Sequence, residues 1–174
     1  MRPPYLERIL TDMALESPTG RSDERSVSLL LRKAAVPHRL IDVGAYARTA
    51  EEAAGNLGAP LASIVKSLVC VAEGTVMVAM VPGDRALSFE RLDHAAGTLG
   101  CKLAGRSLVE RTTGYIVGGV APVGLPAGLP VYGDASILDL PVIYCGAGSD
   151  RHMLQIAPRD LCSVAAIEWS DLCT

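Results

Sequence analysis

Aromatic residues are scarce in this sequence: they make up only 4% of its 174 residues, while hydrophobic residues as a whole make up 49%. So few aromatic side chains argue against a single-strand nucleic-acid binder built on stacked bases. The hydrophobic share excludes a disordered chain and requires a core built from aliphatic side chains. A chain of this length is expected to fold as one domain with a sizeable core.

The sequence also lacks an excess of positive charge, because 16 Lys and Arg residues stand against 19 Asp and Glu residues, for a net charge of −3. Nucleic-acid binders usually carry a basic footprint. Any contact with RNA must therefore use a local patch, and a scattered solvated surface is the alternative for at least half of the arginines considered. Those arginines are Arg85, Arg91, Arg106, Arg111, Arg151 and Arg159.

Motifs of metal, redox and common hydrolytic sites are missing as well. The five cysteines form no Cys-x-x-Cys pair, and no Cys or His residues have zinc spacing. No order of Ser, His and Asp, no His-Glu-x-x-His motif, no P-loop and no dinucleotide fingerprint is present. No hydrophobic run approaches the length of a membrane span, and no secretory leader precedes the odd number of thiols. We therefore expect a cytoplasmic protein with reduced cysteines, no metal, no cofactor and no membrane contact.

What the sequence does contain is a glycine-rich stretch at residues 112–124, TTGYIVGGVAPVG. Gly118, Gly119 and Gly124 accept backbone conformations closed to other residues, and Pro122 fixes its own φ and removes one amide donor. Such a loop is stiff and exposes its remaining N–H groups, which form an anion or oxyanion site when they converge. A tight strand-to-loop turn without a ligand is the alternative, and the stretch alone does not decide between the two.

A second unusual position is Lys66, in the run IVKSLVCV over residues 64–71. Strand alternation places Lys66 on one face with Leu68 and Cys70, and both faces of the run are mostly apolar. This pattern is typical of a strand buried on both sides, where a lysine is rarely found without a partner. Lys66 therefore either extends to solvent or lines a pocket that receives an anion or a carbonyl oxygen.

The rest of the chain alternates between helix and strand signals. Thr49 and Glu52 form a capping box, and Glu73-Gly74 is a link typical of a hairpin. Because hairpins interleave with helices, we expect a mixed sheet. The expected helices span residues 3–18, 22–36, 49–58, 88–96 and 107–114 and begin again at 158. The expected strands span residues 38–43, 64–72, 75–81, 101–103, 142–145 and 152–157.

Some side chains can be assigned a place from spacing alone. Ser22 and Ser107 are expected as N-caps, because serine is a favoured residue at that position. On the helix over residues 88–96, Phe89 is expected to face inward with Leu92 and Ala96, and His94 to face solvent. His38 is interpreted as an exposed or capping histidine.

Several segments occur in an order and spacing that resemble the YbaK/ProX family of aminoacyl-tRNA deacylases, which includes the editing insertion domain of bacterial prolyl-tRNA synthetases. These segments are IVKSLV, VAMVPGDRALSFERL, TGYIVGGVAPVGLP, LPVYGDASIL and IYCGAG. The resemblance runs from about Ser26 to Asp171. It implies a single α/β (α+β) domain at residues 21–174, with a mixed, mostly antiparallel curved sheet surrounded by helices. Residues 1–20 would be an appended helix, packed on the domain or used in dimerisation.

The resemblance further implies a metal-independent hydrolase that deacylates mischarged tRNA in trans, with Cys-, Ala- or Ser-tRNA(Pro) as the expected substrates and prolyl-tRNA synthetase as a candidate partner. Lys66 matches the family's essential lysine and is expected to bind the terminal adenosine phosphate or the acyl carbonyl. Gly118 and Gly119 are the implied catalytic positions of the loop. The implied substrate-binding residues are Tyr115, Val120, Pro122, Gly124, Asp134, Gly146 and Gly148. A turn-capping role is the alternative for Asp134.

Two departures bear on the amino acid that is removed. Ser67 follows the lysine where the ProX-like branch tends to have Asn, and the segment CGAGSDR lacks the histidine that this branch tends to carry. Both favour the YbaK-like branch, yet YbaK has a serine where this chain places Gly146. A binding module that holds tRNA or a synthetase without hydrolysis is the alternative function, and an esterase for small aminoacyl esters is a weaker third. Monomer and homodimer both stay open.

Overall fold

The computed structural model describes residues 23–44 and 49–174. The helix expected over residues 3–18 and the N-cap expected at Ser22 lie outside these residues, and the division at residue 20 stays a prediction. Among the described residues, the helices are α2 (Glu24–Lys33), α3 (Ala50–Leu57), α4 (Phe89–Ala96), α5 (Arg106–Thr113) and α6 (Pro158–Val164), with short 3-10 helices η1 (Leu61–Ser63) and η2 (Ala135–Asp139). The strands are β1 (Arg39–Asp42), β2 (Ile64–Ala72), β3 (Thr75–Pro82), β4 (Lys102–Leu103), β5 (Val131–Asp134), β6 (Ile143–Gly146), β7 (His152–Ile156) and β8 (Glu168–Ser170).

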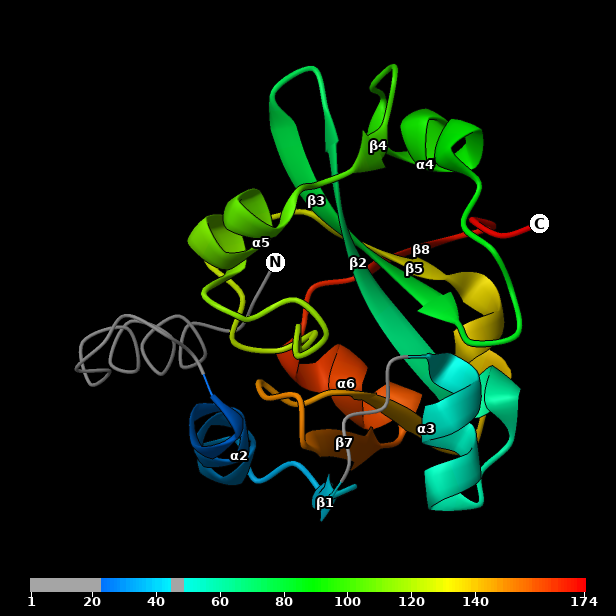
Figure 1. The fold of residues 1–174 in the computed structure, drawn as a ribbon. Coiled ribbons are helices and arrows are strands. Elements are labelled where there is room, and N and C mark those ends of the chain that lie inside the picture. The colour runs from blue at the N-terminus through cyan, green and yellow to red at the C-terminus, as the bar shows by residue number, and fades with distance from the viewer. Residues whose placement is uncertain (1–22, 45–48) are drawn as a thin grey trace.

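The strands form one eight-stranded sheet in the order β1-β7-β6-β2-β3-β5-β8, and β4 pairs with β2 outside this path. Four of the strand pairings are antiparallel and three are parallel. The helices lie around the sheet, with α2, α3 and α6 below its centre in the view of Figure 1 and α4 and α5 above it. The prediction of a mixed, mostly antiparallel sheet surrounded by helices is confirmed.

Local sequence signals account for most of these elements. Glu73 and Gly74 both have positive φ and join β2 to β3 with Ala72 opposite Thr75, as the predicted hairpin requires. Thr49 and Glu52 make both hydrogen bonds of the capping box at the start of α3. Gly114 ends α5 in the left-handed conformation, with φ of 75°.

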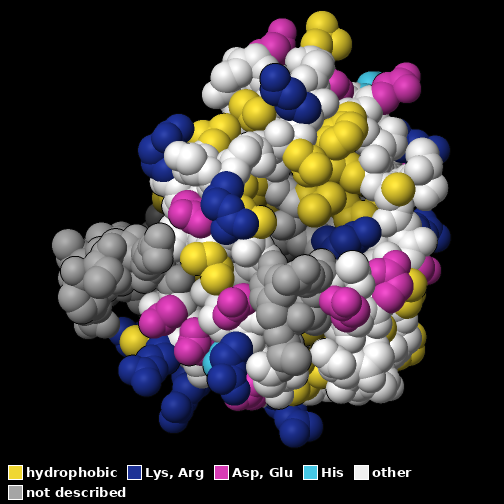
Figure 2. Space-filling view, in the orientation of Figure 1, with side chains coloured by type: hydrophobic (Ala, Val, Ile, Leu, Met, Phe, Trp, Pro, Cys, Tyr) yellow, Lys and Arg dark blue, Asp and Glu magenta, His cyan; other side chains and the backbone are white. Residues whose placement is uncertain are grey.

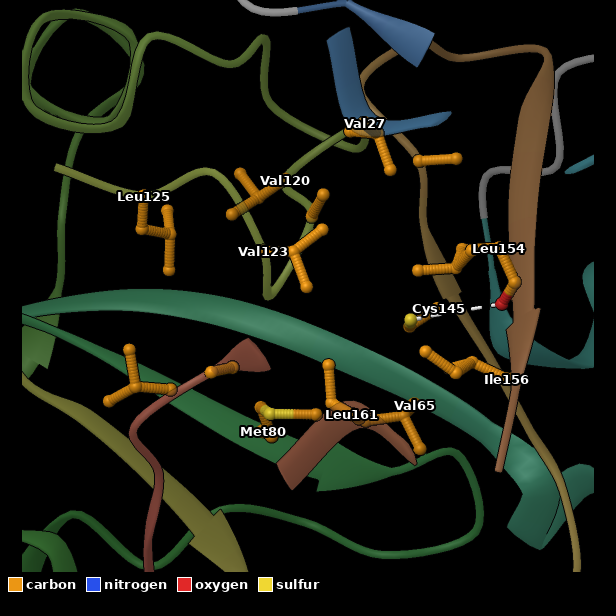
Figure 3. Close-up of a cluster of buried hydrophobic side chains, with 14 of the residues drawn as sticks. Val27, Val65, Met80, Val120, Val123, Leu125, Cys145, Leu154, Ile156 and Leu161 are labelled. Carbon is orange, nitrogen blue, oxygen red and sulfur yellow. Dashed lines mark hydrogen bonds between the residues drawn. The ribbon is translucent and has the colours of Figure 1, made fainter. Parts of the chain in front are cut away.

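The largest group of buried side chains lies on the β2 face that carries Val65 and Val69, because α2 and the glycine-rich loop cover it with apolar side chains. A second, smaller group that includes Cys70 lies on the opposite face. Figure 3 shows Val65 and Met80 from the sheet and Val120 and Val123 from the loop, all of which belong to the largest group of buried side chains. Burying this many aliphatic side chains stabilises the fold by about 25 cal/mol for each Å² of apolar surface removed from water. No helix of the described residues is long and apolar enough to cross a bilayer.

Some local predictions are wrong. α5 begins after Gly105 without a side-chain cap, so Ser107 lies inside the helix. Phe89 is 38% exposed, because it is the first residue of α4 and lies beyond the face that buries Leu92.

Tyr115 anchors the glycine-rich loop to the core. Its ring is buried, and its hydroxyl donates a hydrogen bond of 2.7 Å to the Val123 carbonyl oxygen across the loop. Its own amide donates to Thr113 Oγ1 at 3.1 Å. The two ends of the loop are thereby held together around one buried side chain.

Replacing Tyr115 with Phe should lower the free energy of unfolding by about 1–3 kcal/mol, because it leaves the buried Val123 carbonyl oxygen without this donor. Urea unfolding followed by circular dichroism measures the change. Tyr144→Phe is the matched control, because the half-buried Tyr144 hydroxyl has only a weak contact of 3.4 Å with Gln155 Nε2. Equal losses in both variants would show that the Tyr115 hydroxyl does not hold the loop.

Candidate active site

A cavity of about 620 Å³ opens between β2, the glycine-rich loop and the end of β6. Residues 64–69 of β2 form its floor, and Val117, Gly118 and Val120 of the loop lie across from them. Gly146 and the segment 149–153 close one side, and Arg106 of α5 lies at another. The size is typical of a small-molecule site.

Lys66 reaches this cavity from β2 and lines it, so the pocket interpretation of this lysine is the one that the structure supports. Its ammonium Nζ donates a hydrogen bond of 2.9 Å to the Arg85 carbonyl oxygen, in the loop that follows β3. The Arg85 guanidinium in turn lies 3.8 Å from the carboxylate of Asp134. The lysine is therefore held at a fixed place while part of its hydrogen-bonding capacity remains available.

The glycine-rich loop turns two of its residues toward the cavity. Gly118, with φ of 90°, and Val120 both line it. The Gly119 amide donates to the Ile116 carbonyl oxygen at 3.0 Å, and its own carbonyl oxygen accepts from the Gly148 amide at 2.8 Å. Gly119 therefore shapes the loop, while Gly118 and Val120 are the loop residues that face the cavity.

Gly146 lets the end of β6 approach the loop closely. A Cβ atom at this position would overlap the Val120 carbonyl oxygen and come within 3.1 Å of the Gly119 carbonyl carbon. Only a residue without a side chain fits there, since both neighbours are backbone atoms. Gly146 also lines the cavity, so this contact fixes the distance between the loop and the sheet.

Five of the seven residues expected to bind substrate lie away from this cavity. Pro122 is buried, and Gly124 packs against Tyr115, whose hydroxyl would lie 2.7 Å from a Cβ at position 124. Gly148, with φ of 98°, packs against the backbone of Asp23 at the start of α2. These residues hold the loop and its neighbours in place, and they do not line the cavity. The five are Tyr115, Pro122, Gly124, Asp134 and Gly148.

Asp134 takes the turn-capping role. Its Oδ1 accepts from the Ser136 amide at 3.1 Å and caps η2, and its Oδ2 accepts from the Leu172 amide at 3.0 Å. Burial raises the pKa of this carboxyl, but hydrogen bonds from Ser136, Cys173 and Leu172 outweigh it and hold the pKa below its ordinary value. Asp134 therefore stays ionised and ties the C-terminal residues to the end of β5.

Ser149 and His152 line the cavity and were missed by sequence reasoning. Ser149 Oγ lies 2.9 Å from His152 Nδ1, and Glu24 Oε1 lies 4.0 Å from the same nitrogen. A Ser-His-acid catalyst needs the serine and the acid on opposite ring nitrogens. Because both approach Nδ1 here, the cluster does not have the geometry of a nucleophilic triad. The sequence signal was weak, since His152 is simply the first residue of β7.

Of the six arginines considered for an RNA patch, Arg106 is the one that lines the described cavity, and its side chain is 74% exposed. Arg91 and Arg151 form close ion pairs with Asp171 and Asp42, at 2.7 and 2.9 Å. In Figure 2, a group of hydrophobic side chains lies to the right of the centre of the view, and Lys or Arg side chains lie below it and to its left, with Asp or Glu side chains nearby. The lining of the cavity combines apolar side chains with basic and acidic ones, among them Arg106 and Glu51.

The buried cysteines do not supply a nucleophile here. Burial raises the pKa of Cys145 to about 12, and the pKa of Cys70 also to about 12, so both thiols stay protonated near neutral pH. Within residues 23–44 and 49–174, no group of three or more His, Cys, Asp or Glu side chains is arranged to hold a metal ion.

Comparison with known proteins agrees with this fold. A family model for the aminoacyl-tRNA editing domain matches residues 45–163. The Enterococcus faecalis protein EbsC, named as a candidate Cys-tRNA(Pro)/Cys-tRNA(Cys) deacylase, is 30% identical over 127 residues, which are 72% of this chain and 77% of EbsC. The proline–tRNA ligase of Geobacter metallireducens is 44% identical over 78 residues, but the match spans 45% of this chain and only 14% of the ligase.

Solved structures agree as well. A crystal structure described as that of a candidate trans-editing enzyme for prolyl tRNA synthetase has a TM-score of 0.78 and 30% identity, and covers 91% of this chain and 98% of its own. The crystal structure of the hypothetical protein APE2540 has a TM-score of 0.79 and 31% identity, and covers 85% and 99%. On the family match and these relatives together, the chain belongs to the aminoacyl-tRNA editing domain family.

Proposed function

We propose that this chain is a trans-acting hydrolase that removes a wrongly attached amino acid from tRNA. The observation that carries the proposal is that Lys66 and Gly118, far apart in the sequence, meet in one cavity with Gly146. The names of EbsC and of the trans-editing structure support the same reaction. The acceptor end of a mischarged tRNA would be the substrate, and Arg106 at the mouth would contact its phosphates.

The reaction needs little catalytic assistance from the protein, because an aminoacyl-tRNA ester is already activated and has a ribose hydroxyl beside the reacting carbonyl. The Lys66 ammonium donates one hydrogen bond to the Arg85 carbonyl oxygen, and its two other hydrogens can donate to an ester carbonyl or a phosphate. Amides of the loop at Gly118 and Val120 would stabilise the developing oxyanion. Holding water or the substrate's own nucleophile in line would supply much of the remaining acceleration. This mechanism uses no metal ion.

The cavity favours a small amino acid. Its floor and roof carry valines, among them Val65, Val69 and Val120, and its volume must hold the terminal nucleoside as well as the acyl group. In an apolar pocket one methylene changes binding by only about 1–3 kcal/mol. Cys-, Ala- and Ser-tRNA(Pro) are the proposed substrates, and prolyl-tRNA synthetase is the proposed partner.

Lys66→Ala should abolish deacylation while tRNA binding persists, because the variant loses the cation that holds the ester or the terminal phosphate. The measurement is release of amino acid from Cys-, Ala-, Ser- and Pro-tRNA(Pro) and from Cys-tRNA(Cys), in buffer containing EDTA. We expect wild type to cleave at least one mischarged species and to spare Pro-tRNA(Pro). Lys33→Ala, at the exposed end of α2, is the matched control and should retain full activity.

Two results would contradict this proposal. Binding of tRNA without release from any species would leave the non-catalytic binding module as the function. Hydrolysis of small aminoacyl esters with no detectable affinity for tRNA at low salt, where phosphate contacts are strongest, would leave the simple esterase.

Gly146→Ala should cut deacylation by at least about tenfold, because the added methyl pushes the Val120 carbonyl oxygen, and with it the loop, away from Lys66. Kinetics under single-turnover conditions measure the effect. Gly55→Ala in α3 is the control: a Cβ there meets no atom within 4 Å, so activity should be unchanged. Full activity of Gly146→Ala would show that the spacing of loop and sheet is not needed for the reaction.

A further inference from the structure

The edge of β2 that faces the cavity is interrupted. On this edge β2 pairs with β6 up to Val65, opposite Cys145, and pairs with β4 only from Cys70 onward, opposite Leu103. Between these two ladders, the Val69 carbonyl oxygen accepts from the Ala104 amide at 2.9 Å. Residues 66–68 therefore have no strand partner on this edge within the part of the chain that the structure describes.

The main chain of Ser67 points into this gap. Alternate residues of a strand direct their N–H and C=O groups to the same edge. Because the Val69 carbonyl oxygen points to the β4 side, the N–H and C=O of Ser67, two residues earlier, point to the same side. The gap thus presents one strand donor and one strand acceptor that belong to a single residue.

The side chain of Ser67 adds a third polar group. Its Oγ is buried, and it has no hydrogen-bond partner among the described residues. An unpaired buried hydroxyl is costly, so such a group normally has a partner when the site is occupied. The cavity wraps this part of β2 on both faces, since it is lined by Lys66 and Leu68 on one and by Val65 and Ser67 on the other.

An α-amino acid ester matches this set of groups. Its ammonium and its carbonyl oxygen are separated by one Cα, as are the N–H and C=O of a strand residue, so it can pair with Ser67 as a single strand residue would in an antiparallel ladder. An ammonium has three donors and seeks several acceptors. Ser67 offers two, its carbonyl oxygen and its Oγ, and one donor for the ester carbonyl.

We propose that Ser67 positions the substrate by its α-amino group: the ammonium donates to the Ser67 carbonyl oxygen and Oγ, and the Ser67 amide donates to the ester carbonyl oxygen. The second lone pair of that carbonyl stays free for the glycine-rich loop. The site then recognises the α-ammonium and the ester carbonyl, which all aminoacyl groups share, and the side chain contacts the apolar walls of the cavity. This inference rests on the proposed deacylase function and adds that a free α-amino group is required.

The test compares three esters of the same tRNA(Pro): Ala-tRNA, N-acetyl-Ala-tRNA and the lactyl-tRNA in which a hydroxyl replaces the amino group. Each enzymatic rate is divided by the spontaneous hydrolysis rate of the same ester, because the ammonium itself activates the ester. We expect wild type to favour Ala-tRNA over both analogues by at least about tenfold after this correction, as loss of a charged hydrogen bond implies.

The variants separate positioning from stability. Ser67→Ala should lower kcat/KM for Ala-tRNA and reduce its preference over lactyl-tRNA, whereas Ser67→Thr, which keeps the hydroxyl, should retain that preference. Ser163→Ala, on the exposed side of α6, should change neither. A change in this preference is a readout that a purely structural role of Ser67 would not move.

Three results would overturn the inference. If wild type cleaves all three esters equally well relative to their spontaneous rates, the inference fails and the deacylase function stands. The inference also fails if Ser67→Ala leaves the preference for the amino ester unchanged. If wild type cleaves none of the five aminoacyl-tRNAs of the earlier panel, the proposed function fails and the inference falls with it.

Discussion

The close approach of Gly146 to the Val120 carbonyl oxygen is the contact on which the cavity depends. It brings the end of β6 against the glycine-rich loop, and the hydrogen bond from the Gly148 amide to the Gly119 carbonyl oxygen continues the same contact. On the other side of the loop, the Tyr115 hydroxyl ties Val123 into the core. The loop is therefore fixed from both sides, and it forms the wall of the cavity across from β2.

A loop fixed in this way suits the proposed deacylation. Hydrolysis of an activated ester needs orientation and fixed dipoles more than it needs a strong nucleophile. The residues around the cavity fit this requirement, because they supply a lysine held by a hydrogen bond, the backbone of the loop and an unpaired strand edge at Ser67. They supply no activated nucleophile: the buried Cys145 thiol is protonated, and the Ser149–His152 pair lacks the geometry of a triad.

Sequence reasoning predicted the parts of the fold that local signals determine. The β2–β3 hairpin follows from Glu73-Gly74, and the start of α3 follows from its capping box. For Lys66 the sequence left both solvent and a pocket open, and in the structure this half-buried lysine lines the cavity. Strand β8 was missed, because its three residues carry no periodicity and it is defined by pairing with β5.

The site was predicted less completely, for a physical reason. A motif shows which residues occur together in the sequence but not which of them face a cavity and which support it from behind. Tyr115, Gly124 and Gly148 belong to the motif because the loop needs them as supports. His152 and the unpaired Oγ of Ser67 become visible only when β2, β6 and β7 are brought together.

The most direct test of the central claim is a crystal structure of the protein with a non-hydrolysable mimic of the acceptor end, an aminoacyl group joined by an amide to 3′-amino-3′-deoxyadenosine. The account predicts that the aminoacyl group lies against residues 66–68 of β2, across the cavity from Gly118, with its carbonyl oxygen toward the loop. Binding of the mimic at any other place on the molecule, with this cavity empty, would contradict it.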